Sequence, residues 1–141
     1  VLLDHYGIDC TGKRAVVIGR SPVVGRPAAM LLLARNATVT VCHTRTADLP
    51  AVTREADILV TAAGAAGSLT AAHVRPGQTV IDVSANWDAA KNTIVGDSDE
   101  SAASVVDAIT PVPGGVGAVT STVLMAHVIR AAERAAEGGC L

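Results

Sequence analysis

The sequence contains almost no aromatic residues, since one Trp, one Tyr and no Phe occur among 141 residues. So few rings leave little surface on which single-stranded bases could stack, and a net charge of −2 provides no basic footprint. We therefore expect no nucleic-acid partner. Half of the residues are hydrophobic, and most of these are Ala and Val, which suit close packing of helices on a sheet within one domain.

Cysteine is scarce as well, and Cys10, Cys42 and Cys140 form no Cys-x-x-Cys pair. This pattern predicts no disulfide framework and favours a reducing, cytoplasmic setting, with Cys10 and Cys42 buried and Cys140 a thiol in the tail. His5, His73 and His127 show no metal-ligand spacing, so we expect no metal site. No apolar run is long enough to span a bilayer and no charged-then-apolar leader occurs, so we expect no membrane partner.

Strand and helix patterns alternate along the chain, which is typical of an α/β fold. Apolar or β-branched runs predict strands at 14–19, 37–42, 57–61, 79–83 and 94–95. Helical spacing predicts a helical tail at 1–6 and helices at 27–36, 47–55 and 120–137. The first strand is a continuous apolar run after Arg14, as in parallel strands buried on both faces. We therefore predict one doubly wound Rossmann-type domain over residues 1–141, with a mostly parallel sheet.

A glycine turn follows the first predicted strand and opens the next helix, reading Gly-Arg-Ser-Pro-Val-Val-Gly from Gly19 to Gly25. Backbone N–H groups in such a turn bind the pyrophosphate of a dinucleotide. Ser21 stands where the standard fingerprint has its second Gly, and its hydroxyl can itself donate to a phosphate oxygen. The alternative is a turn with a structural role only, because any βα junction can use glycine.

The second predicted strand ends without the acidic residue that NAD-specific domains place there to bind the ribose 2′-hydroxyl. His43, Thr44 and Arg45 follow it instead. Thr44 can donate a hydrogen bond, and Arg45 and Arg20 can each reach an additional phosphate, so the pattern favours NADP over NAD. The alternative for Arg45 is a solvated surface position. We interpret His43 as a hydrogen-bonded structural residue.

A second glycine cluster, at 110–117, combines two prolines with three glycines, Gly114, Gly115 and Gly117. The prolines stiffen the segment and the glycines allow close backbone approach, so we expect it to line a ligand pocket and to form neither helix nor central strand. The alternative is a rigid connector. Asp82 and Asp97 end or follow strands, and we interpret them as turn or capping residues.

Together these motifs resemble the bifunctional methylenetetrahydrofolate dehydrogenase/methenyltetrahydrofolate cyclohydrolase family, in its C-terminal NAD(P)-binding domain. The matching stretches cover nearly the whole chain in order: 17–27, 38–43, 56–58, 80–83, 96–97 and 110–117. The family oxidises methylenetetrahydrofolate with NADP and hydrolyses the methenyl product to formyltetrahydrofolate. The resemblance therefore implies an NADP-dependent enzyme of folate one-carbon metabolism that works as a cytosolic homodimer.

The resemblance also implies roles for individual residues. Gly19, Arg20 and Ser21 would hold the cofactor phosphates and ribose, and Thr44, with Arg45 beside it, would take the 2′-phosphate. The backbone of Ala85 would meet the nicotinamide side. The glycine-rich loop would close over the cofactor through Gly114, Gly115 and Gly117. No catalytic residue is assigned to this chain.

The chain departs from the family pattern in two short stretches and lacks one larger part. Ser84-Ala85-Asn86 stands for Gly-Ile-Asn, and Ala118-Val119-Thr120 stands for Pro-Met-Thr. The family's catalytic lysine, its tyrosine partner and the folate-holding acid lie in an N-terminal domain, and Lys13 and Lys91 do not match that motif. We expect the folate substrate to be bound through this missing domain, and the chain alone to bind cofactor without turnover.

Two other interpretations remain open from the sequence. One is a stand-alone dinucleotide-binding module without catalytic activity. The other is the NADP domain of a different two-domain enzyme, such as a relative of shikimate dehydrogenase, although those proteins lack the Pro-x-Pro-Gly-Gly segment that begins here at Pro111.

Overall fold

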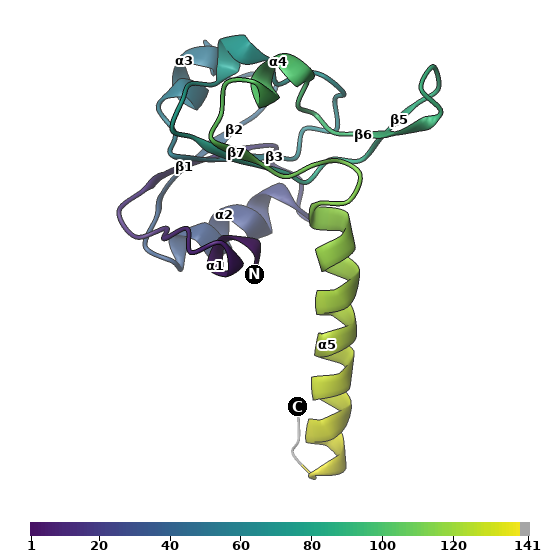
Figure 1. Ribbon diagram of the computed structural model, residues 1–141. Coiled ribbons are helices and arrows are strands. Elements are labelled where there is room, and N and C mark those ends of the chain that lie inside the picture. Colours follow the sequence, from purple (N-terminus) through teal and green to yellow (C-terminus); the bar gives the residue numbers. More distant parts are fainter. Residues whose placement is uncertain (139–141) are drawn as a thin grey trace.

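A parallel sheet of five strands, in the order β2-β1-β3-β4-β7, forms the centre of the computed structural model, which describes residues 1–138 (Figure 1). The sheet strands are β1 (Arg14–Ile18), β2 (Thr38–Cys42), β3 (Ile58–Thr61), β4 (Thr79–Asp82) and β7 (Ala108–Ile109). The helices are α1 (Leu2–His5), α2 (Gly25–Leu33), α3 (Leu49–Arg54), the 3-10 turn η1 (Ala71–His73), α4 (Glu100–Ala103) and α5 (Val116–Ala136). The doubly wound α/β prediction is confirmed.

Helices cover both faces of the sheet, and the side chains of β1 alternate between the two cores. Val16 and Ile18 pack in the core shared with α3, η1 and α4, whereas Ala15 and Val17 pack in the core shared with α1 and α2. Burying a Val or Ile side chain contributes about 1.5–3 kcal/mol, so β1 stabilises both layers at once. This explains why its sequence is apolar at every position after Arg14.

The strand order reverses beside β1. One neighbour, β2, lies on one side of it, and β3, β4 and β7 lie on the other. In open parallel sheets the chain leaves β1 and β3 in opposite directions at such a point, which opens a crevice at the carboxyl ends of the strands. The turn that follows Ile18 therefore lies at the position where this class of sheet binds its ligands.

The predicted pattern of strands and helices needs correction after β4. The strand expected at 94–95 belongs to β6 (Thr93–Val95), which pairs with β5 (Asn86–Asp88) in a separate antiparallel hairpin. Ala108–Ile109 forms the short edge strand β7. Helix α5 begins at Val116, inside the segment expected to be non-helical, because the first turn of a helix needs no intrahelical N–H partners and tolerates this sequence.

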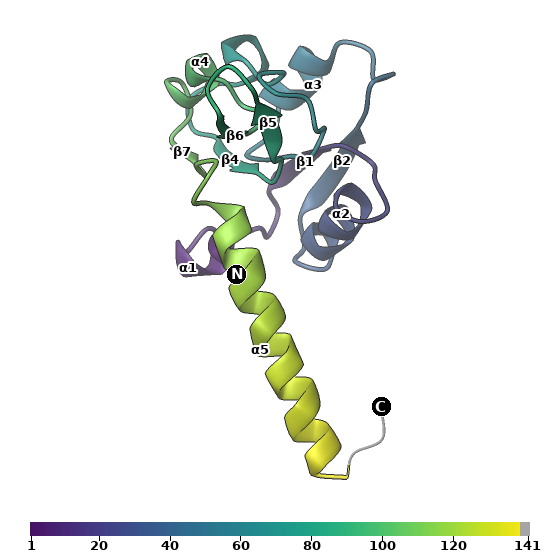
Figure 2. The ribbon, with the colours of Figure 1, turned by 90° about the vertical axis from the view of Figure 1, so that its right-hand side faces the viewer.

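Helix α5 and the β5–β6 hairpin extend away from the sheet (Figures 1 and 2). No residue of α5 is buried, and its large apolar side chains Leu124 and Met125 are each 63% exposed. Trp87, on the hairpin, is 66% exposed. Cys10 and Cys42 are buried as predicted, while Cys140 lies outside the described residues.

Candidate functional site

The turn after β1 can be made only by glycine at its first position. The Gly19 N–H donates to the Cys42 carbonyl at 2.9 Å, which extends the pairing of β1 with β2. Its φ is +121°, and a Cβ there would overlap the carbonyl oxygen of Ala62 at the end of β3. The requirement follows from the crevice itself, because the chain passes between the ends of two neighbouring strands.

Helix α2 starts in close contact with the same turn. A Cβ on Gly25 would overlap the Gly19 carbonyl oxygen. Ser21 fixes this arrangement, since its Oγ accepts hydrogen bonds from the N–H of Val24 at 3.1 Å and, more weakly, from that of Gly25 at 3.4 Å. A hydroxyl that accepts still has its own hydrogen to donate. Ser21 can therefore cap the helix and contact a phosphate oxygen.

Three backbone amides of this turn stay available to a ligand. Within the part of the chain that the structure describes, the N–H groups of Arg20, Ser21 and Val23 make no hydrogen bond. All three residues are exposed, and they precede the positive end of the α2 dipole. Unpaired amides in front of a helix are the donor set that a pyrophosphate requires, so the residues present fit a dinucleotide.

The end of β2 lies beside this turn, because Ile18 of β1 pairs with Cys42 of β2. The loop that follows is held by His43, whose Nδ1 accepts from the Arg45 N–H at 3.1 Å and whose N–H donates to Thr46 Oγ1 at 2.9 Å. The structural interpretation of His43 is therefore confirmed. Burial raises the pKa of the Cys42 thiol, which keeps it protonated and poor as a nucleophile.

The side chains of Thr44, Arg45 and Arg20 are exposed at this edge. Among the described residues, neither arginine takes part in an ion pair. Arg26 supports the turn, since its Nε donates to the Arg20 carbonyl at 3.1 Å. The structure thus gathers positive charge and a hydroxyl beside the exposed amides, and it places no carboxylate in positions 43–46.

A second group of predicted residues surrounds a cavity of about 230 Å³, which Ala85, Gly114, Gly115 and Gly117 line together. A Cβ on Gly115 would overlap the Pro111 carbonyl oxygen, and Gly114 has a φ of +96°, so both positions require glycine. A Cβ on Gly117 would meet no heavy atom within 4 Å. The structure therefore brings these four residues together, while Gly19, Arg20 and Ser21 form the separate β1–α2 turn.

Sequence reasoning missed the role of Asp97. Its carboxylate is fully buried and lies between the loops that follow β3 and β4. It accepts hydrogen bonds from Thr61 Oγ1, Ser84 Oγ, Asn86 Nδ2 and the N–H groups of Ala63, Gly64 and Ala65. Burial acts to raise the pKa of Asp97, but these donors outweigh it and hold the pKa below its usual value.

The interpretation of Asp82 and Asp97 as turn or capping residues holds, because both carboxylates accept hydrogen bonds from backbone N–H groups at strand ends, but it did not indicate that Asp97 joins two loops. Asp82 is also buried, and its carboxylate accepts from the N–H groups of Ser84 at 3.1 Å and Ser98 at 2.8 Å. The signal that could have found them is the pair Gly96-Asp97. A glycine directly before an acid suggests close packing against another backbone or side chain, and here Gly96 packs against Asp82.

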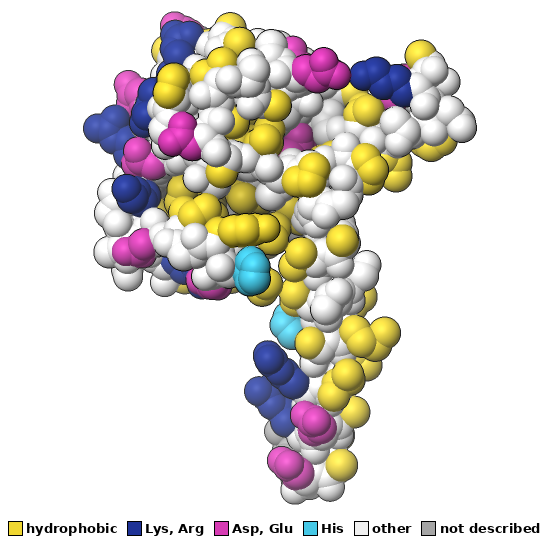
Figure 3. Space-filling view, in the orientation of Figure 1, with side chains coloured by type: hydrophobic (Ala, Val, Ile, Leu, Met, Phe, Trp, Pro, Cys, Tyr) yellow, Lys and Arg dark blue, Asp and Glu magenta, His cyan; other side chains and the backbone are white. Residues whose placement is uncertain are grey.

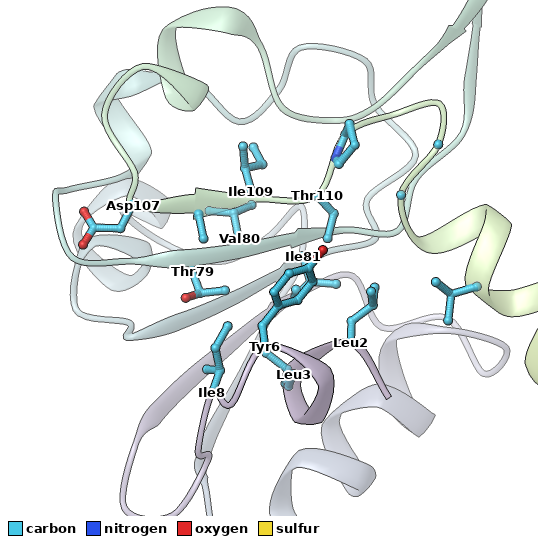
Figure 4. Close-up of a pocket in the computed structure, with 15 residues that line it drawn as sticks. Leu2, Leu3, Tyr6, Ile8, Thr79, Val80, Ile81, Asp107, Ile109 and Thr110 are labelled. Atoms are coloured by element: carbon cyan, nitrogen blue, oxygen red, sulfur yellow. The ribbon is translucent and has the colours of Figure 1, made fainter.

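A larger cavity, of about 780 Å³, lies away from the β1–α2 turn, between α1 and the strands β4 and β7. Leu2, Leu3 and Tyr6 lie opposite the sheet residue Ile81 (Figure 4). Hydrophobic side chains gather where the body of the molecule meets α5 (Figure 3). This apolar lining suits a protein segment better than a phosphorylated cofactor.

Within residues 1–138, no group of three or more His, Cys, Asp or Glu side chains is placed to hold a metal ion. None of the helices in this range is both long and apolar enough to cross a membrane.

Comparisons with known proteins agree with this geometry. The bifunctional protein FolD of Nocardia farcinica is 54% identical over 134 residues, a match that spans 94% of this chain and 47% of the relative. That of Herpetosiphon aurantiacus is 53% identical over 137 residues, which is 96% of this chain and 48% of the relative. The chain therefore spans about half the length of the curated relatives it matches.

Solved structures show the same relationship. The bifunctional FolD methylenetetrahydrofolate dehydrogenase/cyclohydrolase of Campylobacter jejuni superimposes with a TM-score of 0.91 at 45% identity, over 94% of this chain and 47% of that one. The Trypanosoma brucei methylenetetrahydrofolate dehydrogenase-cyclohydrolase, complexed with NADP and an inhibitor, has a TM-score of 0.88 at 37% identity, over 96% of this chain and 48% of that one.

The family model described as tetrahydrofolate dehydrogenase/cyclohydrolase, NAD(P)-binding domain, matches residues 1–136. That match includes the β1–α2 turn, the end of β2, the buried Asp97 network and the glycine-rich loop. The chain belongs to this family, as its NAD(P)-binding domain.

Proposed function

We propose that this chain is the NADP-binding domain of a bifunctional methylenetetrahydrofolate dehydrogenase/methenyltetrahydrofolate cyclohydrolase. The observation that carries the proposal is the set of unpaired amides at Arg20, Ser21 and Val23, at the reversal of strand order, in a chain of this family. The whole protein would transfer a hydride from methylenetetrahydrofolate to NADP and then hydrolyse the methenyl product to formyltetrahydrofolate.

In this proposal the residues of the chain bind and orient the cofactor. Gly19 allows the backbone to approach the pyrophosphate, and the N–H groups of Arg20 and Ser21 donate to it. Thr44 and Arg45 hold the 2′-phosphate, with Arg20 contributing charge from the neighbouring turn. The exposure of these side chains and the absence of a carboxylate in positions 43–46 support NADP over NAD.

The nicotinamide half would lie against the second group of residues. Ala85 and the glycines Gly114, Gly115 and Gly117 share one cavity, and glycine backbone leaves room for a flat ring. Bound there, NADP supplies the hydride acceptor, and the chain supplies a fixed position and a wall against water.

We infer that catalysis depends on a further domain and that the described unit is one domain of the whole protein. Neither lysine is placed at the site: Lys13 precedes β1, at the opposite end of that strand from Gly19, and Lys91 lies in the β5–β6 turn. The exposed apolar side chains of α5 and the large apolar cavity beside its root form a surface on which such a domain, which also binds the folate, would pack.

We also infer a cytoplasmic homodimer, which rests on the family resemblance. Trp87 and Ile94 form a cross-strand pair on the β5–β6 hairpin and are 66% and 42% exposed. Covering this pair with a second copy would bury two large side chains. Sedimentation of the chain and of its Trp87→Gln variant tests for the homodimer. We expect a larger monomeric fraction in the variant. A monomeric parent chain would contradict the inference.

The experiment that tests the cofactor assignment is a calorimetric titration of the chain with NADP and, separately, with NAD. We expect tighter binding of NADP, and no heat with either would contradict the proposal. In an assay with methylenetetrahydrofolate and NADP, the chain alone should show only background turnover. Turnover near the rates of the relatives would mean that the chain contains a base that we have not identified.

The alternative of a stand-alone module gains no support from the comparisons, because the relatives described above are dehydrogenase/cyclohydrolase proteins. The gene region before Val1 would separate the two directly. A tyrosine-x-x-x-lysine motif encoded upstream supports the enzyme, and a start codon at Val1 supports the module.

A further inference from the structure

Asp97 joins the two loops that border the cofactor crevice, and Ser84 connects it to the loop after β4. We propose that Asp97 and Ser84 act as a positioning pair, which sets the place of Ala85 relative to the β1–α2 turn and thereby orients the nicotinamide half of the cofactor. The inference rests on the proposed function, because it names residues that tune the same site.

Ser84 is fixed at both its backbone and its side chain. Its N–H donates to Asp82 Oδ1 at 3.1 Å, and its Oγ donates to Asp97 Oδ2 at 2.6 Å. Both aspartates are buried, so neither bond competes with bulk water. Ala85 follows immediately, is exposed and lines the cavity with the glycine-rich loop. The two bonds on Ser84 therefore limit where the Ala85 backbone can lie.

The same carboxylate holds the loop after β3. The N–H groups of Ala63 and Ala65 donate to it at 2.8 Å and 2.7 Å. This loop begins at Ala62, whose carbonyl oxygen lies so close to Gly19 that no Cβ fits between them. The contacts thus run without a gap from the phosphate-binding turn, through the β3 loop and Asp97, to Ser84 and Ala85.

The negative charge of Asp97 is balanced by hydrogen bonds rather than by a cation. No Lys or Arg side chain within the described residues is paired with it. The hydroxyls of Ser84 and Thr61 and the Asn86 amide contribute side-chain donors beside the backbone amides. Glycine, the residue of the family pattern at position 84, would remove the shortest of these bonds, so the Ser84 bond distinguishes this chain from that pattern.

The proposal predicts a selective effect, because only the nicotinamide half of the cofactor depends on Ala85. A suitable probe is 2′-phospho-ADP-ribose, which has the phosphates and the adenosine of NADP but lacks the nicotinamide ring. Calorimetric titrations of the intact chain with both compounds separate the two halves. A tenfold loss of affinity corresponds to about 1.4 kcal/mol, which lies within the contribution of one hydrogen bond to a charged group.

The variants are Ser84→Ala and Ser84→Thr, with Ser98→Ala as the matched control. Ser98 is a nearby serine whose Oγ has no hydrogen-bond partner among the described residues. We expect Ser84→Ala to lower the affinity for NADP about tenfold, while the affinity for 2′-phospho-ADP-ribose changes by less than about twofold. We expect Ser84→Thr, which keeps the hydroxyl, to restore most of the loss, and Ser98→Ala to behave as the parent.

Three results would overturn the positioning role: equal weakening of both compounds by Ser84→Ala, no weakening of either, or the same loss with Ser98→Ala. If the parent chain binds neither compound, the proposed function fails instead. Amide hydrogen exchange then still tests, without any ligand, whether the Ser84–Asp97 bond holds the loop after β3. Faster exchange at Ala63 and Ala65 in Ser84→Ala supports it, and unchanged exchange overturns it.

Discussion

The carboxylate of Asp82 lies against Gly96 so closely that a Cβ on Gly96 would overlap Oδ2 and lie 2.8 Å from Cγ. Gly96 is itself buried between β6 and Asp97. The backbone of one strand end and the buried acid of another thus occupy adjoining space with no room for a methyl group. This contact brings β6 against the end of β4 and places Asp97 beside the crevice.

Gly96→Ala is therefore expected to lower the free energy of unfolding by about 2–3 kcal/mol. The added methyl group must push Asp82 away from the N–H groups of Ser84 and Ser98, which leaves buried polar groups unpaired. Urea denaturation measures the change. A loss below about 0.5 kcal/mol would show that the neighbouring segments move apart easily.

Gly115 and Gly117 provide a contrast within one loop. Gly115→Ala should destabilise the chain, because its Cβ would overlap the Pro111 carbonyl oxygen. Gly117→Ala should instead stabilise it by about 0.5–1 kcal/mol, since this position is helical, with open space around it. If Gly117 faces the cofactor, the same variant binds NADP more weakly, even though the variant chain is more stable. Thermal unfolding and titration together separate these effects, and unchanged NADP affinity would remove Gly117 from the site.

Much of the fold was predictable, because its strongest signals are local. The apolar run of β1, the glycine turn and the β-branched alternation of β2 each reflect contacts with immediate neighbours in the sheet. The predicted glycine positions follow from close approach, as Gly19 and Gly115 show. The helical spacing from residue 120 onward also identified α5, although not its start at Val116.

The Asp97 network was not predictable in the same way. Its donors include Thr61, Ala65 and Ser84, which lie 36, 32 and 13 positions away in the sequence. Half of its six donors are backbone amides, which any residue supplies. A single acid after a glycine resembles a turn residue until the ends of β3 and β4 are placed side by side. The β5–β6 hairpin was missed for a related reason, since its strands are only three residues long.

The double variant Thr44→Glu/Arg45→Ala should lower the affinity for NADP by at least about tenfold and the affinity for NAD much less. A carboxylate at position 44 repels the 2′-phosphate but can accept a hydrogen bond from a free 2′-hydroxyl. The matched control is Thr122→Glu/Arg130→Ala, which makes the same changes on exposed α5 positions. Equal losses for both cofactors in calorimetric titrations would contradict the assigned selectivity.

Replacing apolar residues on α5 should leave the chain's own stability almost unchanged. Leu124 and Val128 are 63% and 57% exposed, so Leu124→Gln/Val128→Gln is expected to alter the free energy of unfolding by less than about 0.5 kcal/mol per site. Val119 is half-buried and lines the apolar cavities, so Val119→Gln should cost more. Equal losses from both variants would mean that α5 packs on its own domain rather than on another.

Asp97→Asn should change the pH dependence of stability in a defined direction. The folded pKa of Asp97 is lowered below its usual value, so its ionised form stabilises the chain at neutral pH. That contribution persists down to about pH 4 and is lost as the pH falls further through the folded pKa. Asparagine turns an NH₂ group toward donors, so the variant should lose about 2 kcal/mol at pH 7. The gap between parent and variant in the free energy of unfolding should narrow as the pH falls below about 4. Urea denaturation across this range measures it, with the exposed Glu133→Gln as the control. A gap that is constant with pH would mean that Asp97 contributes through packing rather than through its charge.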